Sequence, residues 1–535
     1  MNKTLLFRLA VFCLCIAAIP NLTKAQFSGG DGSEKNPYII TTAEQLAQLA
    51  TYVNEDDTDE PVWADKHYKL GNDIDLSEYG ENWNDGKGWI PIGMYHNTYS
   101  LENKPFKGVV DGNNKRITGL YIFGYYIFEG YFYEVNYYLG LFGYINSSGI
   151  VKNIGVDNAI TCNSFISGII VGQNEGSLIN CNSTDCIMNS RSFQQNVAKV
   201  GAGVVGFNAG SVLNCYVENI LIDYTSSDHH TVGGVVGANT GIVSNCYSTG
   251  IVSTSSSSML TAGIAGGITG NNSGIVSNCY SSCLISPTTE DVSAGGVVGN
   301  NLGSILNCYS IGDINADGYS AYSGGIVGSC SGGSNVLGCA ALNPRVHCYR
   351  WCMYKYFGRV CGHFRGDLSN NIAFNNILNP EENTTWDNKG ANEIDGEDIF
   401  LIDIFADGTL GGRFTEENGW TIQNGKLPGL FGKTVDMPEH LLMSDVDELR
   451  IKNYELLVYP NPTSGKLKIS GFVSKVDGDV EIYDITGRKV QSFGISNSES
   501  KNVENTHETF IDISHFPKGV YFLRIGNQTV KVVKY

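Results

Sequence analysis

The sequence predicts an all-β fold: a parallel β-helix (solenoid) with N- and C-terminal caps, followed by a small antiparallel β-sandwich. Three observations predict it. A segment like GGVVGANTGIVSNC, at residues 233–246, recurs along the middle of the chain. Within each copy, glycine and asparagine separate short runs rich in Val, Ile, Thr and Tyr. The repeat is absent from residues 454–535, where alternating strand patterns have glycine-centred turns.

The repeat has a regular period. Self-similarity every 20–50 residues is typical of stacked repeats. No copy carries a long apolar run at helical spacing, so we predict that the units are strands. Eight such coils, at roughly 4.8 Å each, would form a core on the order of 40 Å long. Copies end 29 to 34 residues apart at Cys181, Cys215, Cys246, Cys279, Cys308 and Cys339.

Two columns of asparagine accompany the repeat, and stacked amides can bond to the amides above and below. The first column is Asn174, Asn208, Asn239, Asn272 and Asn301. The second is Asn153, Asn180, Asn214, Asn245, Asn278 and Asn307. The cysteine and the aliphatic residue three before it would face opposite sides of a straight strand. We therefore predict a bend or bulge at the second column, which turns both inward.

The repeat cysteines form a predicted inward column. Without Cys13 and Cys15, which lie in the apolar N-terminal run, thirteen cysteines remain, and an odd number cannot pair completely. We predict buried free thiols, because cysteine packs as a small hydrophobe. The alternative is disulfides between neighbouring coils, whose Cα atoms would lie within bonding range.

Residues 1–25 have the pattern of a signal peptide. Lys3 and Arg8 flank its start, residues 5–19 are apolar, and Thr23-Lys24-Ala25 precedes a cleavage point before Gln26. The apolar run is too short for an anchor, and no later segment has 18 unbroken apolar residues. We expect an exported chain without a transmembrane anchor.

Residues 26–139 are predicted to be an N-terminal cap with the first coil, and residues 140–375 the repeat solenoid. Within the cap we expect a strand at 36–41, a helix from 43 to about 52 capped by Thr42, and a strand at 68–76. A cap covers the open edge of the first coil, which would otherwise pair with other chains.

Residues 121–138 contain ten aromatic residues and two charges. Aromatic side chains dominate many binding contacts, so this segment is a candidate surface for sugar rings or a protein partner. Its candidate binding residues are Tyr125, Tyr126, Tyr131 and Tyr133. The alternative is a hairpin that lies against the solenoid with one face buried.

The charge pattern excludes several classes of function. The formal net charge of −19 disfavours nucleic acid as a partner. No Lys or Arg occurs from 200 to 344, so the clean repeats lack the cationic groups of a polysaccharide lyase. Glu290 and Asp291 are adjacent and would point apart on a strand, unlike a glycosidase pair. No metalloprotease, nucleophile-elbow or phosphate-loop motif is present, and we expect no metal and no cofactor.

Residues 345–365 are basic and aromatic, and the segment contains Cys348, Cys352 and Cys361. We predict a disulfide loop here, with zinc as the alternative. Residues 358–373 look like a degenerate last coil. Residues 376–433 are predicted to be a C-terminal cap with an acidic loop, and residues 434–453 a linker.

The repeat, G-(L/V)-(F/V)-G-x-N-x-G-x-(V/L/I)-x-N-C-Y, resembles the GLUG motif, and Gly140-Leu-Phe-Gly is the copy closest to that name. The resemblance covers roughly residues 86–375. It implies a parallel β-helix of the kind found in bacterial surface proteins, many of them adhesin-like and some beside peptidase domains. Residues 425–432, GKLPGLFG, resemble the tail that ends many such arrays.

Residues 454–535 are expected to form the antiparallel sandwich. Tyr459-Pro-Asn-Pro, Tyr483-Asp-Ile-Thr-Gly-Arg and Pro517-Lys-Gly-Val-Tyr resemble the C-terminal sorting domain of the type IX secretion system. This resemblance implies contact with the type IX secretion machinery, passage across the outer membrane, and a protein released or held at the surface of a Gram-negative bacterium.

Together these features predict an exported, adhesin-like β-solenoid that acts as a non-catalytic binding or structural rod. Its expected ligand is a glycan or a host protein. The alternative is a glycan-cleaving β-helix enzyme, a lyase or glycosidase, with its site outside the clean repeats, near residues 345–400 and dependent on Arg350 or Arg359.

Overall fold

The computed structural model describes residues 27–55, 63–94, 103–128, 131–134, 138–162, 165–192, 199–226, 229–256, 261–349, 352–442, 457–459, 462–472, 480–485, 487–493, 507–525 and 528–535. The chain divides into two compact units, Met1–His440 and Leu441–Tyr535. No helix among the described residues is long and apolar enough to cross a membrane.

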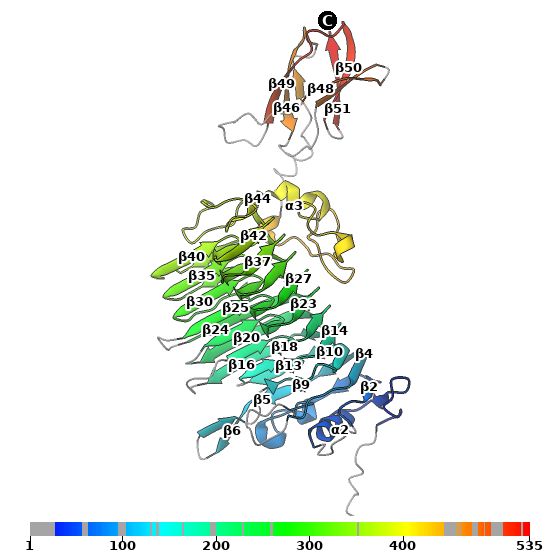
Figure 1. The fold of residues 1–535 in the computed structure, drawn as a ribbon, viewed down its shortest axis with the longest axis vertical. Coiled ribbons are helices and arrows are strands. Elements are labelled where there is room, and N and C mark those ends of the chain that lie inside the picture. The colour runs from blue at the N-terminus through cyan, green and yellow to red at the C-terminus, as the bar shows by residue number, and fades with distance from the viewer. Residues whose placement is uncertain are drawn as a thin grey trace, which may run out of the picture. The chain divides into compact units, whose positions relative to one another are not determined.

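The first unit is a parallel β-solenoid, which confirms the predicted fold class (Figure 1). Most of its described strands form three parallel sheets, which we call sheets 1, 2 and 3. Each central coil adds two or three strands to sheet 1, one to sheet 2 and one to sheet 3. Sheet 2 contains β8 (Tyr138–Leu139), β12 (Ile166–Gly168), β17 (Lys199–Ala202), β21 (His230–Gly233), β25 (Ala262–Gly266), β30 (Asp291–Gly295), β35 (Ser320–Gly324) and β40 (Tyr354–Gly358). Sheet 3 contains β9 (Phe142–Ile145), β13 (Val171–Asn174), β18 (Val205–Asn208), β22 (Val236–Asn239), β26 (Thr269–Asn272), β31 (Val298–Asn301), β36 (Val327–Cys330) and β41 (Cys361–His363).

Sheet 1 is the largest, with 26 strands among the described residues, and its early strands lie in the N-terminal segment. Its strands up to residue 226 are β1 (Tyr38–Ile40), β2 (His67–Leu70), β3 (Ile74–Asp75), β4 (Val109–Thr118), β5 (Tyr121–Phe123), β10 (Ile150–Asp157), β11 (Ile160–Cys162), β14 (Ser177–Ile179), β15 (Asn182–Thr184), β16 (Ile187–Ser192), β19 (Ser211–Leu213) and β20 (Tyr216–Ser226). The later strands are β23 (Ile242–Ser244), β24 (Tyr247–Ser255), β27 (Ile275–Ser277), β28 (Tyr280–Ser281), β29 (Leu284–Ile285), β32 (Ser304–Leu306), β33 (Tyr309–Ser310), β34 (Ile314–Ala316), β37 (Ser334–Leu337), β38 (Ala340–Ala341), β39 (Val346–Cys348), β42 (Gly366–Ser369), β43 (Ile372–Phe374) and β44 (Glu397–Ile399).

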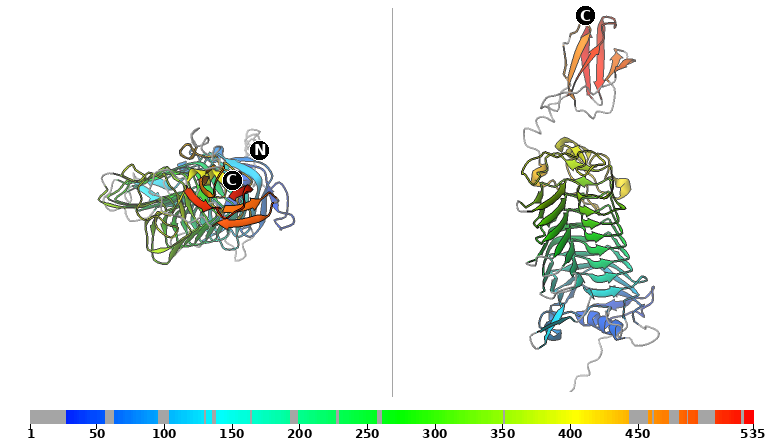
Figure 2. Two further views of the ribbon diagram at one scale, coloured as in Figure 1. Left: turned by 90° about the horizontal axis from the view of Figure 1, so that it is seen from above. Right: turned by 60° about the vertical axis from the view of Figure 1, so that its left-hand side comes forward.

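The strands of successive copies stack over one another (Figure 2), and equivalent residues pair in register. Asn239 pairs with Asn272, and Tyr247 pairs with Tyr280. The first asparagine column forms a buried ladder from Asn174 to Asn301, in which each Nδ2 donates to the Oδ1 of the next coil at 2.8 Å. The ladder amides also bond the turn that follows, since Asn239 Nδ2 donates to the Gly241 carbonyl.

The second asparagine column makes the predicted bend. Asn153, Asn180, Asn214, Asn245, Asn278 and Asn307 all have left-handed backbone, with φ between 50° and 56°. Sheet 1 changes register at this position, for example between Lys152 and Ile154. Val243 and Cys246, three residues apart, are therefore both fully buried. Asn tolerates left-handed backbone better than most residues, which explains its place here.

The cysteines line up in the core as free thiols, as predicted. The backbone N–H of Cys246 lies 3.4 Å from the Cys279 sulfur, and the N–H of Cys279 lies 3.4 Å from the Cys308 sulfur. Burial raises the pKa of the Cys181 and Cys339 thiols well above its usual value, so the two ends of the column are neutral.

The N-terminal elements cover the first coils (Figure 1). Helix α2 (Ala43–Asn54) begins as predicted, where the Thr42 side chain accepts a bond from the Gln45 N–H. The predicted strand at 36–41 is β1, whereas the strand predicted at 68–76 is divided into β2 and β3. Short 3-10 helices follow at η1 (Ser77–Tyr79) and η2 (Asn84–Gly86).

The C-terminal cap is anchored on Arg359, whose side chain is fully buried. Its guanidinium donates to the Asp398 carboxylate at 2.6 Å and to the Gly396 carbonyl at 3.0 Å. The cap continues with α3 (Leu401–Asp407), η3 (Glu416–Asn418) and η4 (Glu439–Leu441). Arg359, which the enzyme hypothesis named, therefore holds the cap on the last coil, and Arg350 lies outside the described residues.

A segment of this cap, residues 409–433, runs back along sheet 1, and we call it the strap. Four tyrosines of successive coils stack at 4.9 to 5.1 Å between ring centroids: Tyr216, Tyr247, Tyr280 and Tyr309. Phe431 of the strap contacts the first two rings, and Trp420 contacts the last two. The strap thus shields an aromatic column from water.

The disulfide loop predicted for Cys348, Cys352 and Cys361 is wrong: all three thiols are free. Cys361 lies on β41, where it pairs with Val327 in sheet 3, and its thiol donates to the His363 carbonyl at 3.3 Å. The segment looked like an insertion, but β40 and β41 continue the stack. The predicted degenerate last coil is therefore present.

The second unit has two antiparallel sheets, as predicted. One contains β45 (Leu457–Tyr459), β46 (Lys466–Phe472) and β49 (His507–Asp512). The other contains β47 (Val480–Asp484), β48 (Lys489–Phe493), β50 (Gly519–Ile525) and β51 (Gln528–Lys534). Leu467, Ile482 and Leu523 lie in their shared core.

We predict that Asn245→Ala destabilises the solenoid by about 1 kcal/mol more than Asn245→Gly, because alanine is strained in left-handed backbone and glycine is not. Both changes remove the bond to Asn214, so their difference isolates the backbone conformation. Urea unfolding followed by tryptophan fluorescence tests this, since all six tryptophans precede residue 440. Equal midpoints for the two variants would contradict the prediction.

We also predict that the first unit loses stability as the pH falls from 7.5 to 5.5. Burial lowers the pKa of His347, His363 and His440 below 6.5, so the unfolded chain binds more protons in this window. The stability that these neutral histidines contribute is fully present above pH 6.5 and is lost as the pH falls below it. The melting temperature by tryptophan fluorescence should fall, and replacing all three histidines with asparagine should flatten its pH dependence. A melting temperature that rises on acidification would refute this.

Candidate binding groove

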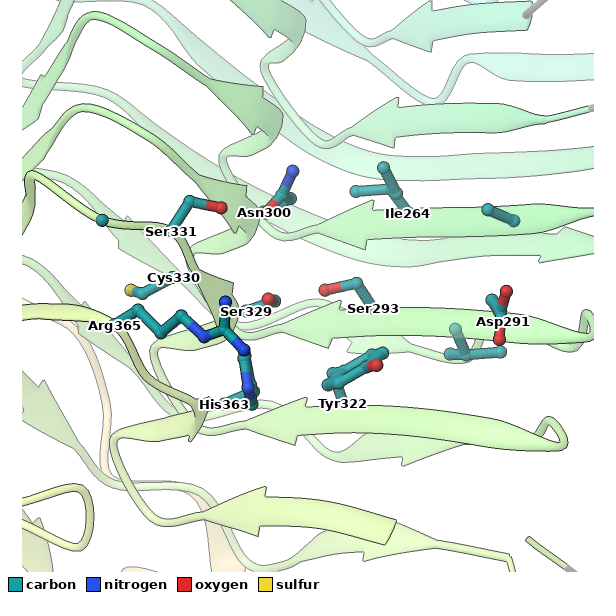
Figure 3. A pocket seen from close by; sticks show the side chains of 13 residues that line it. Ile264, Asp291, Ser293, Asn300, Tyr322, Ser329, Cys330, Ser331, His363 and Arg365 are labelled. Carbon is teal, nitrogen blue, oxygen red and sulfur yellow. The ribbon is translucent and has the colours of Figure 1, made fainter. Parts of the chain in front are cut away.

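Sheets 2 and 3 meet in an outward-facing crease, which opens into a groove of about 430 Å³ over the later coils (Figure 3). One wall comes from β25, β30 and β35 of sheet 2. The other comes from β31, β36 and the end of β41 in sheet 3. The lining residues are Ala262, Ile264, Asp291, Val292, Ser293, Asn300, Tyr322, Ser329, Cys330, Ser331, Gly332, His363 and Arg365.

Glycines let the two sheets come close enough to form the crease. A Cβ on Gly299 would lie 2.6 Å from Ile264 Cγ2, and one on Gly328 would lie 2.7 Å from the Ala294 backbone nitrogen. The same strands are bonded across the crease, because the Ser293 hydroxyl donates to the Gly299 carbonyl at 2.7 Å. The floor is therefore tightly packed backbone, and the walls carry the side chains that a ligand would meet.

The register of the coils places one column of side chains on each wall. The sheet 2 column is Thr231, Ile264, Ser293, Tyr322 and Tyr356. The sheet 3 column is Ala238, Asn271, Asn300, Ser329 and His363. Aromatic rings enter these columns only in the last coils, at Tyr322, Tyr356 and His363, so the groove acquires its aromatic character there.

Three rings form a cluster at the C-terminal end of the groove. Tyr322 and Tyr356 stack with centroids 4.9 Å apart and an interplanar angle of 9°. The His363 ring meets both edge-on, at 5.5 and 5.3 Å. Tyr356 remains 39% exposed, so this cluster offers aromatic surface to solvent.

Two charged groups act on this cluster. Burial, Tyr356 and Asp291 raise the pKa of the Tyr322 hydroxyl, and Arg365 opposes them. Burial and Arg365 lower the pKa of His363, so His363 is neutral at pH 7. Figure 3 shows the Arg365 side chain extending over the groove beside Ser329 and His363. The groove thus has a cation at one end and the carboxylate of Asp291 near the other.

The geometry suits binding of a polar, ring-containing molecule. Aromatic faces pack against apolar ring faces, while short hydroxyl and amide groups bond polar substituents. Asp291 is the one carboxylate among the lining residues, so the groove lacks the two carboxylates of glycosidase chemistry. Within the described parts of the chain, no group of three or more His, Cys, Asp or Glu side chains could hold a metal.

The candidate residues Tyr125, Tyr126, Tyr131 and Tyr133 lie elsewhere. They belong to a two-stranded antiparallel hairpin, β6 (Tyr125–Phe128) and β7 (Tyr131–Glu134), near the N-terminal end of the solenoid (Figure 1). Their side chains lie outside the described residues, so both alternatives for this segment stay open. The structure does not bring the hairpin and the groove together.

Sequence reasoning missed Tyr322 and Tyr356, although a signal was present. Both stand two residues before a repeat glycine, Gly324 and Gly358. Their shared place in the repeat was enough to predict that they stack. The 121–138 segment has the more conspicuous composition, with ten aromatic residues, and so is the stronger signal in the sequence.

Comparison with known families confirms both resemblances. Residues 457–535 match the model of the secretion system C-terminal sorting domain, and residues 228–253 match the GLUG motif. The matched GLUG segment spans β21, β22, β23 and most of β24. The sorting domain indicates a secreted or cell-surface protein that interacts with the type IX secretion machinery.

Two curated proteins share part of the sequence. A protein of Evansella cellulosilytica assigned as a Gly-rich membrane protein is 34% identical over 157 residues, 29% of this chain and 15% of its own length. Halomucin of Haloquadratum walsbyi is 32% identical over 151 residues, 28% of this chain and 2% of its own. The chain therefore spans only a small part of these relatives.

Two solved structures are similar at low identity. One, assigned as an immunoglobulin A1 protease of Bacteroides ovatus, has 16% identity and a TM-score of 0.38, covering 76% of this chain and 96% of that one. The other, an IgA1 protease, has 14% identity and a TM-score of 0.34, covering 78% and 27%. Likeness at this level supports no inference about activity. What the comparisons do establish is a chain that carries a GLUG motif and a type IX secretion sorting domain.

Proposed function

We propose that the protein is an adhesin-like β-solenoid that the type IX system delivers outside the outer membrane of a Gram-negative bacterium, after loss of residues 1–25. It binds an external ligand, a glycan or a host protein, without catalysis. The observation that carries the proposal is the open groove with stacked Tyr322 and Tyr356 on a chain that ends in a sorting domain.

The solenoid suits this role because its binding surface is rigid. Each wall strand bonds to the strands of the coils before and after it, as β30 does with β25 and β35. Side chains on such strands lose little conformational freedom when a ligand binds, which favours affinity. Residues on the walls can change from coil to coil without disturbing the buried ladders, so the frame can carry new contact residues.

The composition of the groove supports binding rather than hydrolysis. A general acid and base need two groups whose pKa values differ and that face one reacting atom. The groove has a single carboxylate, Asp291, and a neutral His363 that is packed edge-on against two tyrosines.

A glycan-cleaving lyase is the second candidate, and one observation favours it. His363, Tyr322 and Arg365 lie together, and they offer a neutral base, a hydroxyl and a cation that could neutralise a uronic acid. In elimination, His363 would take the proton from the carbon next to the carboxylate, a C=C bond would form as the adjacent C–O bond breaks, and the neighbouring sugar would leave with the glycosidic oxygen, which takes a proton from the Tyr322 hydroxyl. An unsaturated product, which absorbs in the ultraviolet, would reveal this activity.

We predict that Tyr322→Ala and Tyr356→Ala together weaken binding to a glycan array by tenfold or more, because each truncation removes an aromatic contact of about 1 kcal/mol or more. The matched control is the hairpin pair Tyr131→Ala and Tyr133→Ala, which should bind as the wild type does. Loss of binding in the hairpin pair alone would move the site to the hairpin. Cleavage of a glycan that does not stay bound to the protein would favour the lyase.

A further inference from the structure

Arg365 is distinguished from the other described arginine side chains of the first unit by its lack of a partner. Arg116 and Arg345 pair with Asp157 and Asp313, and Arg359 pairs with Asp398. Arg413 donates to the carbonyl and side chain of Asn370. For Arg365, no carboxylate of the described residues lies within 4.0 Å, and its side chain is exposed in the groove.

Arg365 is the one lysine or arginine among the described residues that line the groove. No Lys or Arg occurs from 200 to 344, the stretch that supplies most of the groove walls. At physiological ionic strength, charges more than about 8 Å apart are largely screened, so the net charge of −19 acts weakly at this point. An anionic group that enters the groove therefore meets the guanidinium first.

The other lining groups suit a sugar chain. The walls derive from about four successive coils, which at roughly 4.8 Å per coil gives a groove on the order of 14 Å long. The stacked rings of Tyr322 and Tyr356 offer apolar ring surface, and Ser329, Ser331 and Asn300 offer hydroxyl and amide groups. Asp291 at the far end accepts bonds from hydroxyls but repels a second anion.

A peptide ligand fits this groove less well. Extended peptides bind sheets by pairing with an exposed edge strand, where main-chain groups are free. The groove presents the faces of strands that are already paired on both sides, such as β31 with β26 and β36. Its backbone groups are thus used within the solenoid, and recognition depends on side chains.

We infer that the groove binds an acidic oligosaccharide, whose carboxylate pairs with the Arg365 guanidinium while a neighbouring sugar ring packs on Tyr322 and Tyr356. This inference rests on the proposed function and adds the class of ligand. Arg365 offers two parallel N–H donors to a carboxylate, a geometry that a lysine cannot match. The ligand's far end donates hydroxyls toward Asp291.

The test compares each acidic sugar with its own neutral form. Oligogalacturonates, oligoglucuronates and a sialylated trisaccharide are offered to the full chain as free acids and as carboxyl methyl esters. The wild type should bind at least one free acid tenfold or more tighter than its ester. Arg365→Gln should abolish that difference, and Arg365→Lys should restore part of it. Tyr322→Ala should weaken both forms equally.

Lys433→Gln, which removes an equal charge at an exposed site on the strap, is the matched control and should leave the preference intact. Raising the salt concentration should weaken binding of the free acid and leave binding of the ester unchanged. Unchanged melting of each variant by tryptophan fluorescence shows that the fold is retained.

Two results would overturn the inference in distinguishable ways. Equal binding of acid and ester, or an Arg365→Gln variant that keeps the preference, refutes the acidic ligand and leaves the proposed binding function standing. Failure of the wild type to bind any sugar of the panel or of a neutral glycan array refutes the glycan itself, and binding of an acidic peptide in its place would assign the groove to a protein partner.

Discussion

The first unit depends on the register between parallel coils. An asparagine amide can donate to the amide above it only when both coils place the same residue at the same point, one coil spacing apart. The ladder from Asn174 to Asn301 requires this at every step, and the stacked tyrosines from Tyr216 to Tyr309 require it independently. A shift of one residue would break both columns and turn the buried face of every strand outward.

The same constraint creates the candidate site. Because surface residues also align in columns, a change in one copy lies directly over its counterparts in the neighbouring copies. Thr231 and Ala238 occupy the equivalent positions in an earlier coil outside the groove, whereas Tyr322 and Ser329 line the groove later. Beneath Tyr322 the cysteine column continues to the buried Cys339, whereas Cys330 takes the place of the ladder asparagine. Function can therefore vary on the outside of the coils while stability is maintained inside.

The ends of the stack need separate solutions, since a final coil exposes unpaired strand edges. At one end α2 covers the first coils, and at the other an ion pair between the buried Arg359 and the partly exposed Asp398 fastens a cap loop. A buried charge is costly unless it is bonded; Arg359 also donates to two carbonyls, while its buried Nε has no hydrogen-bond partner among the described residues. The strap extends this cap over the tyrosine column, which leaves the groove on another face free for a ligand.

The sequence alone determined the repeat, the solenoid, the asparagine and cysteine columns and the bend at Asn245, because each follows from residues that recur at one period. It also determined the sandwich, whose three blocks have local strand and turn patterns. The tertiary structure alone decided the strap and the groove. Trp420 meets Tyr280 only because the chain folds back, and His363 meets Tyr322 only because two sheets converge on glycines. Such contacts join residues that no local pattern links, whereas the repeat describes only what lies directly above and below.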